Sequence, residues 1–164
     1  MGADEFCDLS AADLRRLYAA RQLSPVEVAE GLLERIEAVD ATLNAFVTVT
    51  HDQALAQAKA AEKLFDGTAD PPPLAGIPFT LKDLTATDGI RTTRGSLLYK
   101  DWIPDYNAPL AQRMLDAGGV LLGKTNTPEL GWKGDSTNRV AGSTHNPWQH
   151  GRSPGGSSGG AAAS

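Results

Sequence analysis

The chain has almost no cysteine. Cys7 is the single cysteine among 164 residues, so an intramolecular disulfide is excluded. A reducing compartment fits this composition, and we expect a cytoplasmic location. We interpret Cys7 as a small apolar residue near the N-terminus rather than as a catalytic thiol, because no basic residue stands beside it in the sequence.

Histidine is also scarce, and its spacing does not suit a metal ion. His51, His145 and His150 do not form a His-Glu-x-x-His pattern, and one cysteine cannot build a zinc site. We therefore expect no metal and no cofactor. Sequence spacing leaves a Ser-His-Asp triad open, but no segment resembles a nucleophile elbow, and ordinary loop or surface histidines are the favoured interpretation.

Long apolar runs and clusters of positive charge are absent as well. No apolar stretch approaches the roughly 18 residues that span a bilayer, and the acidic start MGADEFCDLS is unlike a signal peptide. The formal net charge is −5, without a cluster of Lys and Arg. We therefore expect neither a membrane nor a nucleic acid as a direct partner.

The composition that remains is that of one ordinary packed domain, with 41% hydrophobic and 21% charged residues. Ser10 with Asp13 predicts a capped helix that runs to about Gln22. The segment Ser24-Pro25-Val26-Glu27 is a stronger helix start, with Ser as cap and Pro at the first position. The predicted elements that follow are a helix over 25–39, an extended segment over 43–50 and a helix over 52–65.

The next part of the chain alternates between strand and helix signals. Apolar runs at 76–84 and 120–124 favour short buried strands, and 109–118 favours a helix that ends at glycine. This βαβ-like order predicts an α/β fold with a parallel sheet. A further helix is expected to begin at Thr125, and 131–145 is expected to be a loop.

Lys82 is unusual because it ends an apolar run. One interpretation is a surface lysine that pairs with Asp83 and does nothing more, since most such pairs contribute little. The functional interpretation is a desolvated lysine that has lost its proton and serves as a base. Such a role requires the pKa of Lys82 to fall by about three units from its ordinary value near 10.4.

The stretch 146–164, NPWQHGRSPGGSSGGAAAS, combines glycines, adjacent serines and a run of alanines. It fits a tight loop that presents serines at the start of a helix, because glycine permits unusual backbone conformations and alanine favours helix. The Gly-Ser tract alone also fits a flexible linker. A phosphate loop is disfavoured, because Ala161 stands where the Walker pattern needs lysine after Gly160.

Three ordered stretches of this chain resemble the amidase signature hydrolases. They are LAGIPFTLKDL at 74–84, GVLLGKTNTPELGWKG at 119–134 and NPWQHGRSPGGSSGGAAA at 146–163, and the helical segment 24–49 is similar too. The resemblance implies the N-terminal part of the amidase signature fold, with a mixed central sheet flanked by helices. Residues 1–70 would be its N-terminal helical segment, and 71–164 the first α/β part of its core. It also favours the loop over the linker.

The resemblance further implies a catalytic Ser–cis-Ser–Lys triad. Lys82 matches the family's lysine base, and Ser157 matches the bridging serine, whose preceding peptide bond is cis in the family. The family's nucleophilic serine lies beyond Ser164, and neither Ser158 nor Ser164 matches it. We therefore expect these 164 residues alone to be inactive, and the substrate-binding residues stay unknown.

An amidase is the function that this resemblance implies. It would hydrolyse the C–N bond of a small-molecule carboxylic amide to an acid plus ammonia or an amine, through an acyl-serine intermediate and without a cofactor. A homodimer of the full-length enzyme is possible under this hypothesis. One alternative is the glutaminase-type subunit of a tRNA amidotransferase, and another is a non-catalytic remnant that acts as a binding module.

Overall fold

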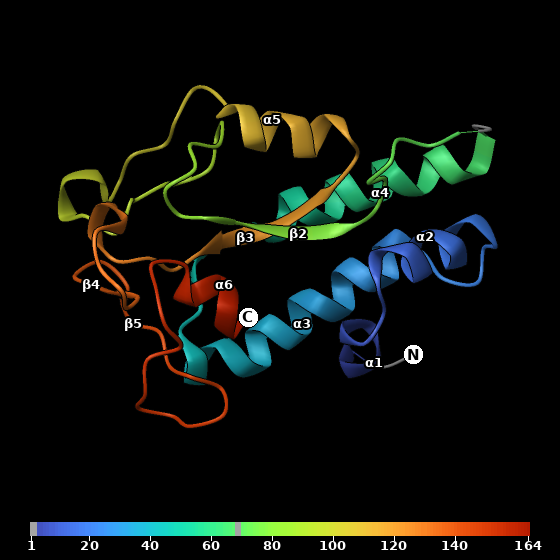
Figure 1. Cartoon of the computed structure of the whole chain (residues 1–164). Helices are drawn as coiled ribbons and strands as arrows, with labels where there is room; N and C mark the ends of the chain where they lie inside the picture. Colours follow the sequence, from blue (N-terminus) through green and yellow to red (C-terminus); the bar gives the residue numbers. More distant parts are fainter. Residues whose placement is uncertain (1–2, 68–69) are drawn as a thin grey trace. The chain divides into compact units, whose positions relative to one another are not determined.

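The computed structural model describes residues 3–67 and 70–164 (Figure 1). Its α-helices are α1 (Ala3–Cys7), α2 (Ala11–Ala19), α3 (Pro25–Leu43), α4 (His51–Gly67), α5 (Pro109–Asp116) and α6 (Gly159–Ala163). Its strands are β1 (Phe46–Val49), β2 (Pro78–Lys82), β3 (Val120–Thr125), β4 (Thr137–Asn138) and β5 (Gly142–Ser143). Short 3-10 turns cover Leu97–Tyr99 and Glu129–Gly131.

The two predicted helix starts are confirmed. The Ser10 side chain accepts a hydrogen bond from the backbone N–H of Asp13 at 3.1 Å and caps α2. At the start of α3, the Ser24 N–H donates to the Glu27 carboxylate at 2.9 Å, and the Ser24 hydroxyl accepts from Val26 N–H. These bonds satisfy N–H groups that have no partner within the helix.

Helix α3 is longer than the sequence predicts, because it ends at Leu43 rather than near residue 39. The helix stops where Asn44 adopts the left-handed conformation with φ of 52°. Asparagine tolerates this conformation better than most residues, and its N–H closes the helix on the carbonyl of Asp40 at 2.6 Å. The stop signal is therefore an asparagine, where a glycine would be easier to recognise.

We predict a modest loss of stability when the α2 cap is removed. Ser10→Ala should lower the free energy of unfolding by about 1 kcal/mol, because the N–H of Asp13 loses its acceptor. Urea unfolding followed by circular dichroism measures the change. Ser10→Asp keeps an acceptor and should stay close to the wild type, so an equal loss in both variants would contradict this role.

The three longer strands form one sheet in the order β1-β3-β2. Strands β1 and β3 are antiparallel, with Phe46 opposite Thr125. Strands β2 and β3 run in the same direction, because Val120 N–H bonds to Ile77 O at one end and Asp83 N–H bonds to Thr125 O at the other. The predicted parallel pair is thus present, and the antiparallel β1 makes the sheet mixed.

The helix expected from Thr125 does not form. Strand β3 continues to Thr125, the next two residues are fully buried, and only a 3-10 turn follows at Glu129–Gly131. Pro128 disfavours helical geometry in the residue before it. Two further elements were not foreseen, namely α1 and the short β4–β5 pair within the expected loop 131–145.

The chain forms two compact units. The first contains Met1–Glu37, Thr50–Phe79 and Arg113–Leu122, and its apolar core packs side chains of α2, α3 and α4 around Tyr18, Val28 and Leu33. The second contains Ala38–Val49, Thr80–Gln112 and Gly123–Ser164, and many of its buried side chains are polar. The sequence-based division at residue 70 stays a prediction. In the described ranges, no helix has the length and apolar character needed to cross a membrane.

Candidate active site

Lys82 and Ser157 meet in the second unit. The Nζ atom of Lys82 lies 2.7 Å from the Oγ atom of Ser157, although the two residues are 75 positions apart in the chain. Lys82 is the last residue of β2, and Ser157 precedes α6, and both are half-buried. The structure therefore brings together the two residues that the sequence selects, within hydrogen-bonding distance.

The environment of Lys82 favours the neutral amine. Burial lowers the pKa of Lys82, because the charged ammonium loses hydration. Its neighbour Asp83 is fully buried, and the carboxylate of Asp83 accepts hydrogen bonds from the N–H and the hydroxyl of Thr93. The alternative of an exposed Lys82–Asp83 pair therefore does not describe this site.

Ser157 lies in a tightly held loop, so the Gly-Ser tract is part of the fold rather than a linker. The Gly156–Ser157 peptide bond is cis, as the resemblance implies. The carbonyl oxygen of Ser157 accepts a hydrogen bond from Thr127 Oγ1 at 3.1 Å. Two residues later, Gly159 N–H donates to Ser136 Oγ at 2.7 Å. These contacts hold the backbone on both sides of the Ser157 hydroxyl.

Asn126 supports this loop, and the sequence interpretation missed it. The carbonyl of Asn126 accepts from Gly160 N–H at 3.2 Å, and its side-chain amide bonds to Thr144 Oγ1 at 3.0 Å. Its Oδ1 accepts from the Asn138 amide at 2.6 Å. Asn126 is fully buried, and the polar run after the apolar strand is the signal that could have identified it.

The histidines and the cysteine lie away from the Lys82–Ser157 pair. The rings of His145 and His150 stack with centroids 4.1 Å apart, and His51 begins α4. Cys7 is exposed at the end of α1. Within residues 3–67 and 70–164, no group of three or more His, Cys, Asp or Glu side chains could hold a metal ion.

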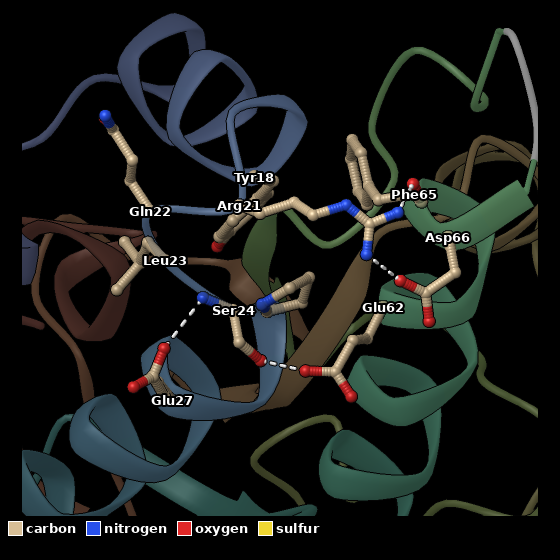
Figure 2. Close-up of a pocket in the computed structure, with 10 residues that line it drawn as sticks. Tyr18, Arg21, Gln22, Leu23, Ser24, Glu27, Glu62, Phe65 and Asp66 are labelled. Atoms are coloured by element: carbon tan, nitrogen blue, oxygen red, sulfur yellow. Dashed lines mark hydrogen bonds and ion pairs between the residues drawn. The ribbon is translucent and has the colours of Figure 1, made fainter.

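A pocket of about 380 Å³ lies in the first unit, and Figure 2 shows the side chains around it. Its acidic groups already have partners within the protein. Glu27 accepts from Ser24 N–H, Glu62 accepts from the Ser24 hydroxyl, and Asp66 forms an ion pair with Arg21. These contacts serve a helix start and join α4 to the segment before α3, which is a structural role.

Comparisons with known proteins agree with this geometry. A family model described as Amidase matches residues 27–164. An acylamidase of Rhodococcus erythropolis is 44% identical over 150 residues, which cover 92% of this chain and 31% of that protein. A glutamyl-tRNA(Gln) amidotransferase subunit of Cutibacterium acnes is 43% identical over 161 residues, which cover 98% and 32%.

Solved structures show the same likeness. The native peptide amidase of Stenotrophomonas maltophilia matches with a TM-score of 0.89 and 33% identity, over 96% of this chain and 34% of that one. A bacterial aryl acylamidase of the amidase signature enzymes matches with a TM-score of 0.88 and 36% identity, over 94% and 32%.

The fold and the comparisons together define the chain as an α/β protein of the hydrolase class. It belongs to the amidase signature family. The chain spans about a third of the length of the relatives that it matches. The part of the fold described above is thus the N-terminal portion of a larger architecture in those relatives.

Proposed function

We propose that the protein containing this chain is an amidase that uses Lys82 as its base and Ser157 as a proton relay. The hydrogen bond of 2.7 Å between Lys82 Nζ and Ser157 Oγ is the observation that carries the proposal. The lowered pKa of Lys82 supports it, because a base must be neutral before it accepts a proton. Membership of the amidase signature family supports it independently.

The reaction follows from the roles of these two groups. A nucleophilic serine attacks the amide carbon, and its proton passes to Ser157 while the Ser157 proton passes to Lys82. The C–N bond then breaks as the proton returns along the same path to the leaving nitrogen. Water attacks the acyl-serine ester in a second round and releases the acid.

The substrate of this reaction is a small-molecule carboxylic amide, which yields an acid plus ammonia or an amine. Ser158 and Ser164 are not assigned as the nucleophile, because the resemblance places that residue further along the chain. A homodimer and a cytoplasmic location stay predictions. The residues that bind the substrate are not assigned.

The 164-residue polypeptide by itself should not hydrolyse amides, because it supplies the base and the relay without an assigned nucleophile. Ammonia or amine release from a panel of aliphatic, aryl and peptide amides measures this. The Ser157→Ala variant of the same polypeptide is the matched control for background release. Turnover by the polypeptide that Ser157→Ala abolishes would contradict the prediction.

A second candidate is the glutaminase-type subunit of a tRNA amidotransferase. It is supported by the similarity to the amidotransferase subunit of Cutibacterium acnes, which covers 98% of this chain. The two candidates differ in substrate, so hydrolysis of glutamine to glutamate by the intact protein would favour the amidotransferase. Hydrolysis of simple amides without glutamine turnover would favour the amidase, and activity on neither would favour a binding module.

A further inference from the structure

Lys124 is a fully buried lysine that the proposed reaction does not use. It lies in β3, and its Nζ atom donates to the carbonyl of Thr85 at 2.6 Å. The same nitrogen donates to the hydroxyls of Thr92 at 2.7 Å and Thr87 at 3.2 Å. One ammonium group thus holds three points of the segment that follows Lys82 and Asp83.

Asp83 is a fully buried carboxylate next to Lys82 in the chain. Its backbone N–H bonds to Thr125 O, and its carbonyl accepts from Arg94 N–H, both at 3.0 Å. Its carboxylate accepts from the N–H of Thr93 at 3.0 Å and from the Thr93 hydroxyl. The residue immediately after Lys82 is therefore held by backbone and side-chain bonds together.

The two buried charges depend on each other. Burial raises the pKa of Asp83, while Lys124 and, more weakly, Arg91 oppose this rise. Burial lowers the pKa of Lys124 to about 8, and Asp83 opposes that fall. An unpaired buried charge is costly, so each group provides the countercharge that keeps the other ionised. Arg91 is held elsewhere, because its Nε donates to Lys100 O at 2.6 Å.

We propose that Lys124 is a positioning residue for the Lys82–Ser157 pair, which acts by neutralising Asp83 and by holding the segment after Lys82. This inference rests on the proposed role of Lys82 as the base. It adds a residue that touches neither Ser157 nor, in our proposal, the substrate. The structure assigns it this role through its contacts with Thr85, Thr87 and Thr92.

The charge balance has a consequence for Lys82. Removal of the Lys124 ammonium leaves the Asp83 carboxylate without its main countercharge beside Lys82. A nearby negative charge favours the protonated lysine, so the pKa of Lys82 rises and less neutral amine is present at a given pH. Removal of both charges restores the balance, so the pKa of Lys82 should return.

The test compares Lys124→Met with the double variant Asp83→Asn/Lys124→Met in the intact protein. Trace labelling with acetic anhydride at a series of pH values, read by mass spectrometry of the peptide that contains Lys82, gives the titration of that amine without any substrate. Lys124→Met should shift it upward by about one pH unit, and the double variant should lie close to the wild type. Lys100→Met removes an exposed lysine and is the control.

Several outcomes would overturn the proposal. A folded Lys124→Met protein with the wild-type titration of Lys82 would do so, and so would a double variant shifted as far as the single one. If Lys124→Met does not fold while the double variant does, the neutralising role is supported directly. If neither folds, Lys124 serves the fold alone and the proposal fails. Because labelling needs no turnover, its result is separate from the test of Lys82 as the base.

Discussion

Lys82→Met should nearly abolish amide hydrolysis by the intact protein. Methionine has a similar length but cannot accept a proton, so the relay through Ser157 loses its end point. General-base catalysis typically contributes 10²–10⁴-fold, and we expect kcat to fall by about this factor. Initial rates of ammonia or amine release, on an amide that the wild type hydrolyses, measure the loss.

The pH profile provides a second readout for the same residue. The base must be neutral, so kcat/KM should rise with pH through the pKa of Lys82. Burial lowers that pKa, so the rise should occur at lower pH than for an ordinary lysine. Lys59→Met, which removes an exposed lysine in α4, should keep both the rate and the profile. Wild-type activity in a folded Lys82→Met protein would exclude Lys82 as the base.

The helix starts could be predicted from the sequence because their signals are local. Ser10 with Asp13 and Ser24 with Glu27 bond within a single turn, so the residues that decide the structure are neighbours in the chain. The end of α3 was harder to predict, because it depends on Asn44. The amide of that residue donates to Ala141 O at 2.7 Å, and this partner is 97 positions away.

The Lys82–Ser157 pair could not be derived from spacing, because no local pattern joins residues 75 positions apart. The family resemblance selected both residues, and the fold places them together. The buried positions of Lys124 and Asn126 were missed for a related reason. The run KTNTPE is polar and contains proline near its end, which favours a helix start at the surface. Long-range bonds from Asn126 to Thr144 and Asn138 override that local preference.

Gly160 in α6 should be among the positions least tolerant of a side chain. A Cβ atom there would lie 2.5 Å from Ala45 O and 2.8 Å from Asn126 O. These are backbone atoms that cannot rotate away, and Gly160 is buried. Gly160→Ala should therefore destabilise the protein by about 3 kcal/mol, at the upper end for overpacking. Urea unfolding with an unchanged m-value measures the loss.

The sign of this effect separates two views of α6. If α6 were an undocked helix, Gly160→Ala would stabilise it, because alanine is favoured over glycine by about 1 kcal/mol in a helix. If α6 packs on Asn126 as the 3.2 Å bond indicates, the same change must be destabilising. Gly134→Ala is the matched control, since its added Cβ meets open space and should change stability by less than about 0.5 kcal/mol. A stabilised Gly160→Ala protein would show that α6 is not docked on Asn126, and would remove the support that the described fold gives to Ser157.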